Sequence, residues 1–153
     1  MNLNELYSDI IREHSISAHN KHHLGTPSIV VPGNNPTCGD EIELELERDN
    51  SIIKDASFTG IGCAVSRASV SIMIDLVRGK TLEEARELAL IFLAMLRREE
   101  LDEESMERLE EAAALQNVAN MPARVKCATM PWHTLLKAIE QLEAANFHYY
   151  RRN

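Results

Sequence analysis

A strictly alternating segment at residues 40–47 constrains the fold more than any other feature of the chain. Apolar side chains occupy every second position, and glutamates fill the positions between them; the apolar set is Ile42, Leu44 and Leu46. Successive side chains of a strand point to opposite faces, so this pattern predicts a strand with one buried and one solvated face. A sheet built from it buries one face and leaves the glutamate row in water.

Two further segments complete the predicted sheet. Residues 52–59 follow the turn signal Asp49-Asn50, so we expect them to pair with the alternating strand as a hairpin. Residues 28–31 are short and β-branched and predict a third strand, which Pro32 ends.

Helical periodicity dominates the rest of the chain. Helices are predicted over 3–13, from Cys63 to a stop at Gly79, behind a capping box of Thr81 and Glu84, and around 132–142. The charge-dense residues 98–111 predict a solvated helix face. Together the elements predict an α+β domain with helices packed on one face of a small antiparallel sheet.

Length and composition set outer bounds. The chain has 153 residues, which predicts a single domain over 1–153. It carries 24 acidic and 16 basic residues and a net charge of -8, which argues against a nucleic-acid partner. No apolar run approaches the length of a membrane span, and the first residues lack the features of a signal peptide. We therefore expect a cytoplasmic protein without a membrane partner.

The three cysteines all fall where one predicted element meets another. Cys38 lies in a loop before the alternating strand, Cys63 between the hairpin and a helix, and Cys127 just before the last helix. Helix N-termini and nearby cations favour the thiolate, and Arg124 and Lys126 just before Cys127 add positive charge beside it. An odd count of three excludes a disulfide framework and, in a reducing compartment, favours metal binding or reactivity.

Three thiolates leave a tetrahedral metal ion one ligand short. Asp40, two residues after Cys38, is the best candidate for the fourth ligand, and His22, His23 and His133 compete with it. A set rich in sulfur suits zinc or iron.

Blander interpretations stand beside these. The cysteines match no short metal motif, so three unrelated buried thiols are an alternative. The histidine-rich residues 14–26 predict a solvated polar loop more readily than a metal site, Trp132 is expected in the core, and Arg124 is equally well explained as a surface charge. Pro131 suggests that the last helix begins near Cys127.

Three segments, taken in order, resemble the U-type iron–sulfur cluster assembly family (IscU/NifU-like), and in particular its SufU-type branch. The segments are Asn35-Pro36-Thr37-Cys38-Gly39-Asp40, Gly60-Ile61-Gly62-Cys63-Ala64-Val65-Ser66, and Pro122-Ala123-Arg124-Val125-Lys126-Cys127-Ala128-Thr129 with Trp132. The resemblance implies an α+β fold with a three-stranded antiparallel sheet and about five helices. It also implies a zinc ion held by Cys38, Asp40, Cys63 and Cys127.

The resemblance further implies a function, the transfer of persulfide sulfur in iron–sulfur cluster assembly. In that hypothesis a cysteine desulfurase of the SufS type donates the sulfur, Cys38 accepts it, and the SUF scaffold complex receives it. Arg124 would help to engage the partner. The alternatives are a scaffold holding a [2Fe–2S] cluster on the same cysteines and a purely structural zinc module. The scaffold branch carries a histidine where this chain has Lys126, and residues 98–111 make a longer insertion, so the sequence favours transfer.

Overall fold

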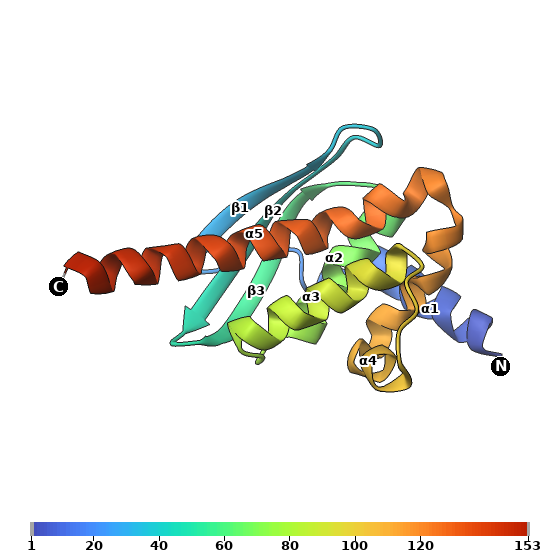
Figure 1. The fold of residues 1–153 in the computed structure, drawn as a ribbon. Coiled ribbons are helices and arrows are strands. Elements are labelled where there is room, and N and C mark those ends of the chain that lie inside the picture. The colour runs from blue at the N-terminus through green and yellow to red at the C-terminus, as the bar shows by residue number, and fades with distance from the viewer. Residues whose placement is uncertain (1, 153) are drawn as a thin grey trace.

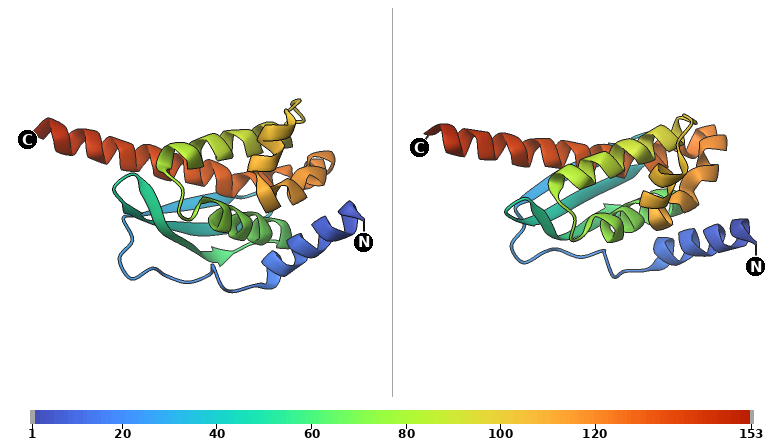
Figure 2. Two further views of the ribbon diagram at one scale, coloured as in Figure 1. Left: turned by 90° about the horizontal axis from the view of Figure 1, so that it is seen from below. Right: turned by 60° about the horizontal axis from the view of Figure 1, so that its bottom comes forward.

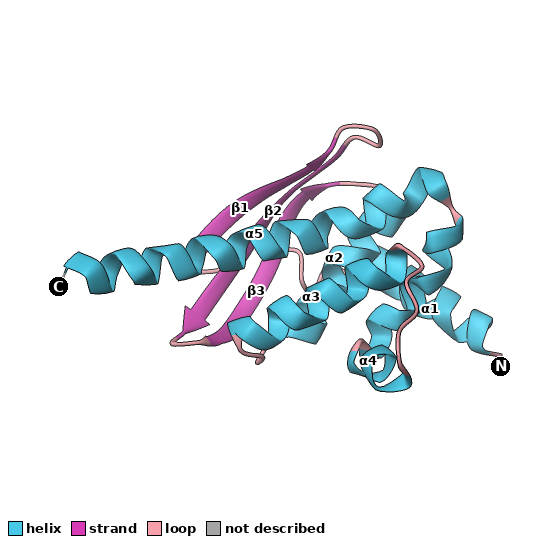
Figure 3. Cartoon of the chain, viewed as in Figure 1, coloured by secondary structure: helices cyan, strands magenta, loops and turns pink. Residues whose placement is uncertain are grey.

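A computed structural model describes residues 2–152 of the chain, and the side chains of residues 2–145. The elements in order are α1 (Leu3–Ile16), β1 (Ile29–Asn35), β2 (Asp40–Asp49), β3 (Ile52–Ile61), α2 (Ala64–Val77), α3 (Leu82–Leu96), α4 (Glu103–Arg108), the 3-10 helix η1 (Glu110–Asn120) and α5 (Pro122–Arg152). Figure 1 and Figure 3 show the long helix α5 lying across the sheet. The predicted α+β class is confirmed, as are the three antiparallel strands and about five α-helices.

The sheet has the order β1-β2-β3, and the alternating strand is its central member. Ile42, Leu44 and Leu46 are at most 4% exposed and form the apolar face, as their alternation predicted. The expectation that Pro32 ends the first strand is wrong, because β1 continues to Asn35. An edge strand tolerates proline since one side of its backbone has no partner strand.

The outer face of the sheet is not left entirely to solvent. Figure 2 shows the helices on one side of the sheet and the connection from α1 to β1 passing along the other. Glu45 is only 3% exposed there: His23 Nδ1 lies 2.6 Å from one carboxylate oxygen, and the Leu24 N–H donates to the other. The prediction of a fully wet glutamate row is therefore wrong at Glu45.

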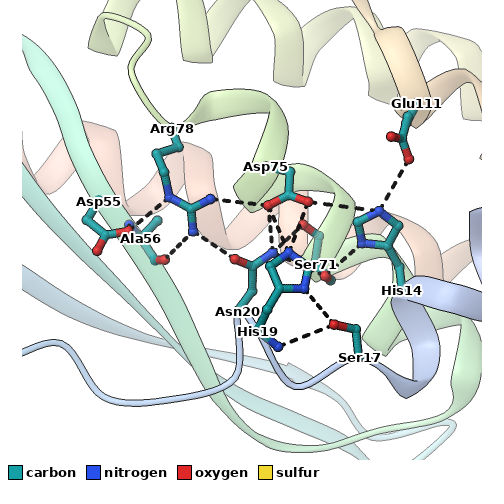
Figure 4. Close-up of polar contacts among 10 residues, drawn as sticks. All are labelled: His14, Ser17, His19, Asn20, Asp55, Ala56, Ser71, Asp75, Arg78 and Glu111. Atoms are coloured by element: carbon teal, nitrogen blue, oxygen red, sulfur yellow. Dashed lines mark hydrogen bonds and ion pairs between the residues drawn. The ribbon is translucent and has the colours of Figure 1, made fainter.

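His14 and His19, at and just after the end of α1, belong to a polar network (Figure 4). His14 lies in α1, with Nδ1 2.8 Å from Ser71 Oγ of α2, while His19 and Asn20 contact the Asp75 carboxylate at 3.2 and 2.9 Å. Burial acts to raise the pKa of Asp75, but hydrogen bonds from Asn20 and His19 outweigh it and hold this pKa below its usual value. The network holds the N-terminal segment against α2. The prediction of a solvated polar loop is therefore wrong for residues 14–20.

The acidic residues 98–111 are solvated only in part. Helix α4 has no buried residue, as expected, but Leu109 is fully buried, and Leu115 of η1 follows it into the core. None of the described helices is both long and apolar enough to cross a bilayer.

Helix α5 is fixed to the core by Trp132. Its indole is fully buried, stacks on Phe92 of α3 with ring centroids 4.0 Å apart, and donates from Nε1 to Ser69 Oγ of α2 at 3.0 Å. Helix α5 also packs tightly on the sheet: a Cβ at Gly33 of β1 would lie 2.3 Å from Thr134 Oγ1. These contacts fix the part of α5 around residues 132–134 against β1, α2 and α3.

Candidate metal centre

Three separate elements bring three of the four predicted ligands together at one end of the sheet. Cys38 lies in the turn between β1 and β2, Asp40 begins β2, and Cys127 lies in α5. Gly39, between the first two, has φ 70°, a left-handed conformation that glycine adopts at little cost. This conformation curls the turn so that the side chains of Cys38 and Asp40 both reach Cys127.

One compact donor group results. The ligand atoms of Cys38, Asp40 and Cys127 all lie within 4.8 Å of one another, and the two sulfurs are 3.0 Å apart. Asp40 and Cys127 are buried, whereas Cys38 is half-buried and therefore open to solvent. Two sulfurs and a carboxylate oxygen are ligands that zinc takes in tetrahedral sites, so the residues fit a zinc ion.

Cys63 borders this group. It is the N-cap of α2, where its sulfur accepts a hydrogen bond from the Ser66 N–H, and its own N–H donates to Asp40 Oδ1 at 2.8 Å. Its side chain also contributes to the raised pKa of Cys127. Its sulfur lies outside the group of three, so a role for Cys63 as the fourth ligand stays a prediction.

The Asp40 carboxylate is held by three donors. Besides the Cys63 N–H, Ser66 Oγ donates to Oδ1 and Asn35 Nδ2 donates to Oδ2, each at 3.1 Å. Burial acts to raise the pKa of Asp40, but these hydrogen bonds outweigh it and lower the pKa below its usual value. The carboxylate is thus charged and oriented before any cation binds.

Sequence reasoning singled out neither Asn35 nor Ser66 as functional. Asn35 also donates to Cys127 Sγ at 3.5 Å, so it touches two members of the group. Both residues lie within the segments that carry the family resemblance, three residues from Cys38 and Cys63 respectively. Their closeness to the cysteines in the sequence could have marked them as functional. That both side chains donate to Asp40 is visible only in the structure.

The expectation that Cys127 lies at the start of a helix is wrong. Helix α5 begins at Pro122, because proline is well suited to a first helical turn, and Cys127 lies inside the helix. Burial, together with the side chains of Cys38 and Cys63, raises the pKa of the Cys127 thiol rather than lowering it. Pro131, also inside the helix, cannot donate the usual bond to the Cys127 carbonyl.

Arg124 lies exposed in the first turn of α5, beside the cysteines. Interaction with the Cys127 side chain, followed by the charges of Cys63 and Cys127, raises the pKa of its guanidinium. The competing histidines lie elsewhere: His23 contacts Glu45, and among the described residues no histidine joins the donor group.

We expect Ser66→Ala to lower zinc affinity about tenfold or more, since outer hydrogen bonds of this kind orient a ligand. Asp40 would lose one of the two donors to Oδ1 while every sulfur remains. Competition with a chromogenic chelator measures the change, and Ser8→Ala, an exposed serine of α1, is the matched control. Equal zinc affinity in the two variants would show that Ser66 does not position Asp40.

Comparison with known proteins assigns this arrangement to a family. The model of the NifU-like N-terminal domain matches residues 6–152, nearly the whole chain. The chain belongs to the NifU-like N-terminal domain family. The family resemblance inferred from the three cysteine segments is thereby confirmed.

Relatives of this NifU-like domain carry two kinds of name. The zinc-dependent sulfurtransferase SufU of Bacillus subtilis is 43% identical over 95% of this chain and 97% of the relative. The iron–sulfur cluster assembly scaffold protein IscU of Streptococcus pyogenes is 42% identical over 91% of this chain and 86% of its own. A crystal structure from Fervidobacterium islandicum, described as a scaffold protein for the SUF system, superposes with a TM-score of 0.82 at 34% identity, covering 90% and 99% of the two chains.

Proposed function

We propose that this NifU-like domain is a zinc-dependent sulfurtransferase of iron–sulfur cluster assembly. It accepts persulfide sulfur from a cysteine desulfurase of the SufS type and passes it to the SUF scaffold complex. The observation that carries the proposal is the half-exposed Cys38 thiol at the mouth of an otherwise buried donor group. The extensive likeness to the Bacillus subtilis sulfurtransferase supports it.

Cys38, Asp40, Cys63 and Cys127 would hold the zinc ion. A bound zinc ion supplies positive charge that favours the thiolate forms of its cysteine ligands. Asp40 is prepared for this role because three donors already fix its charged carboxylate. Cys127 is fully buried and so has no access to a partner. Cys38 and Cys63 are both half-buried, but the Cys63 sulfur already accepts a hydrogen bond from the Ser66 N–H, so we assign Cys38 as the thiol that a donor protein reaches.

The transfer itself is a thiol exchange. The Cys38 thiolate attacks the outer sulfur of the donor persulfide, forming a new S–S bond, while the S–S bond in the donor breaks. The donor cysteine leaves as a thiolate, so charge and oxidation state balance without an external oxidant or reductant. Arg124, exposed beside the cysteines, places a fixed cation where the anionic sulfur arrives.

A cluster scaffold is the second candidate. It is favoured by relatives of similar identity that are named scaffold proteins, such as the one from Streptococcus pyogenes. The same cysteines would then hold a [2Fe–2S] cluster. Lys126 weakens this alternative, because its protonated ammonium has no lone pair with which to ligate iron.

Metal analysis and sulfur transfer together test the proposal. We expect purified protein to be colourless with one zinc per chain, and to take up radiolabelled sulfur when a cysteine desulfurase turns over labelled cysteine. Brown protein with visible iron–sulfur absorption would favour the scaffold. Zinc without any labelled persulfide would leave only a structural zinc module.

A further inference from the structure

A groove of about 480 Å³ opens beside the metal centre, between α5 and β1. Its walls are residues 32–37 and one face of α5 from Lys126 to Lys137. No described residue of β2 or β3 lines it, so the groove follows the side of β1 that has no partner strand. Thr37 lies at its end and is the neighbour of Cys38.

The ionisable groups of this groove are all basic. His133 and Lys137 follow Lys126 by seven and eleven residues. At 100° per residue, this spacing puts all three on one face of α5. All three are exposed, and none forms an ion pair or hydrogen bond with another described side chain. No acidic residue among those that the structure describes lines the groove, although the chain as a whole has a net charge of -8. This local reversal of charge is complementary to an acidic ligand.

The dimensions match a short extended peptide. Lys126 and Lys137 are about 16 Å apart along the helix axis at ~1.5 Å per residue, a span that about five extended residues cover. Apart from Pro32, which has no N–H to donate, the free edge of β1 offers backbone groups to such a peptide, as in strand addition to a sheet edge. Pro32 and Met130 add apolar surface between the charges.

We propose that the groove binds an extended acidic segment of a partner protein alongside β1, with its carboxylates at Lys126 and Lys137. That the partner takes part in sulfur transfer rests on the proposed function. That its segment is acidic and extended rests on the charge and dimensions of the groove. A segment bound here ends next to Thr37, so it holds its protein beside the Cys38 thiol.

Fluorescence anisotropy with a labelled peptide of six alternating glutamate and valine residues tests the proposal. The double variant Lys126→Glu with Lys137→Glu should bind at least about tenfold more weakly, since two exposed ion pairs become repulsive. Lys21→Glu with Lys54→Glu, two exposed lysines outside the groove, makes the same change in net charge and should bind as the wild type does. Binding should also weaken as salt is raised.

Equal weakening by both double variants would overturn the proposal, because it would reduce the effect to net charge. Equal binding of a lysine–valine peptide would overturn it as well. Displacement of the peptide by a short oligothymidylate or by inorganic phosphate, with the same dependence on Lys126 and Lys137, would replace the peptide site by a general anion site. The assay needs neither zinc nor a sulfur donor, so its failure and the failure of the proposed function are separate results.

Discussion

Cys38→Ser is expected to reduce persulfide uptake from a cysteine desulfurase to background, a loss of roughly a hundredfold or more, because a hydroxyl does not take part in thiol exchange. Cys38 is the half-exposed member of the donor group, and the buried Cys127 thiol has a raised pKa that disfavours its thiolate. Cys63 is half-exposed as well, but its sulfur lies outside the donor group and accepts from the Ser66 N–H, so we do not expect it to substitute for Cys38. Gel-shift labelling of persulfides after desulfurase turnover measures the loss.

Two controls separate the nucleophile from the metal. Thr37→Ser changes the neighbouring exposed side chain and should retain full uptake. Asp40→Asn removes the carboxylate charge from the donor group but leaves every thiol, so it should lower zinc content, while Cys38 in the fraction that retains zinc still accepts sulfur. Uptake by Cys38→Ser at the wild-type level would exclude Cys38 as the acceptor.

Trp132→Ala is expected to cost about 3–5 kcal/mol of unfolding free energy, the range typical of deleting a large buried aromatic side chain. The indole is fully buried and stacks on Phe92 at 4.0 Å, so its removal leaves a cavity between α5 and α3. Because domains of this kind are stable by only about 5–15 kcal/mol, the variant should unfold at much lower urea concentration.

Trp132→Phe is the matched variant for this experiment. It keeps an aromatic ring against Phe92 but loses the hydrogen bond from Nε1 to Ser69 Oγ, so we expect a smaller cost, about 1–2 kcal/mol. Urea unfolding followed by circular dichroism gives both values. Equal costs for the alanine and phenylalanine variants would show that the hydrogen bond, and not the packing, is what Trp132 contributes.

Features set by neighbouring residues could be predicted from the sequence. The alternation of Ile42, Leu44 and Leu46 predicted the central strand because the side-chain period of a strand is local. The capping box of Thr81 and Glu84 predicted the start of α3 for the same reason, and both of its hydrogen bonds are present. The grouping of Cys38 with Asp40 followed from their spacing in one turn.

Features set by distant contacts escaped prediction. Glu45 is buried because His23 and Leu24, some twenty residues earlier, cover it, and no pattern around Glu45 records that. The apolar spacing from Trp132 onward, together with Pro131, predicts a last helix that starts near Cys127, whereas α5 already begins at Pro122. The donor from Ser66 to Asp40 likewise depends on how α2 lies against the start of β2, 26 residues away in the chain.

The most direct test of the central claim is to locate the acquired sulfur in the wild-type protein. Zinc-loaded protein is incubated with a cysteine desulfurase for a single turnover, alkylated, digested and analysed by mass spectrometry. The proposed function predicts that the peptide containing Cys38 alone gains the mass of one sulfur atom, while those containing Cys63 and Cys127 do not. Added sulfur on Cys63 or Cys127 instead, or on no cysteine at all, would contradict it.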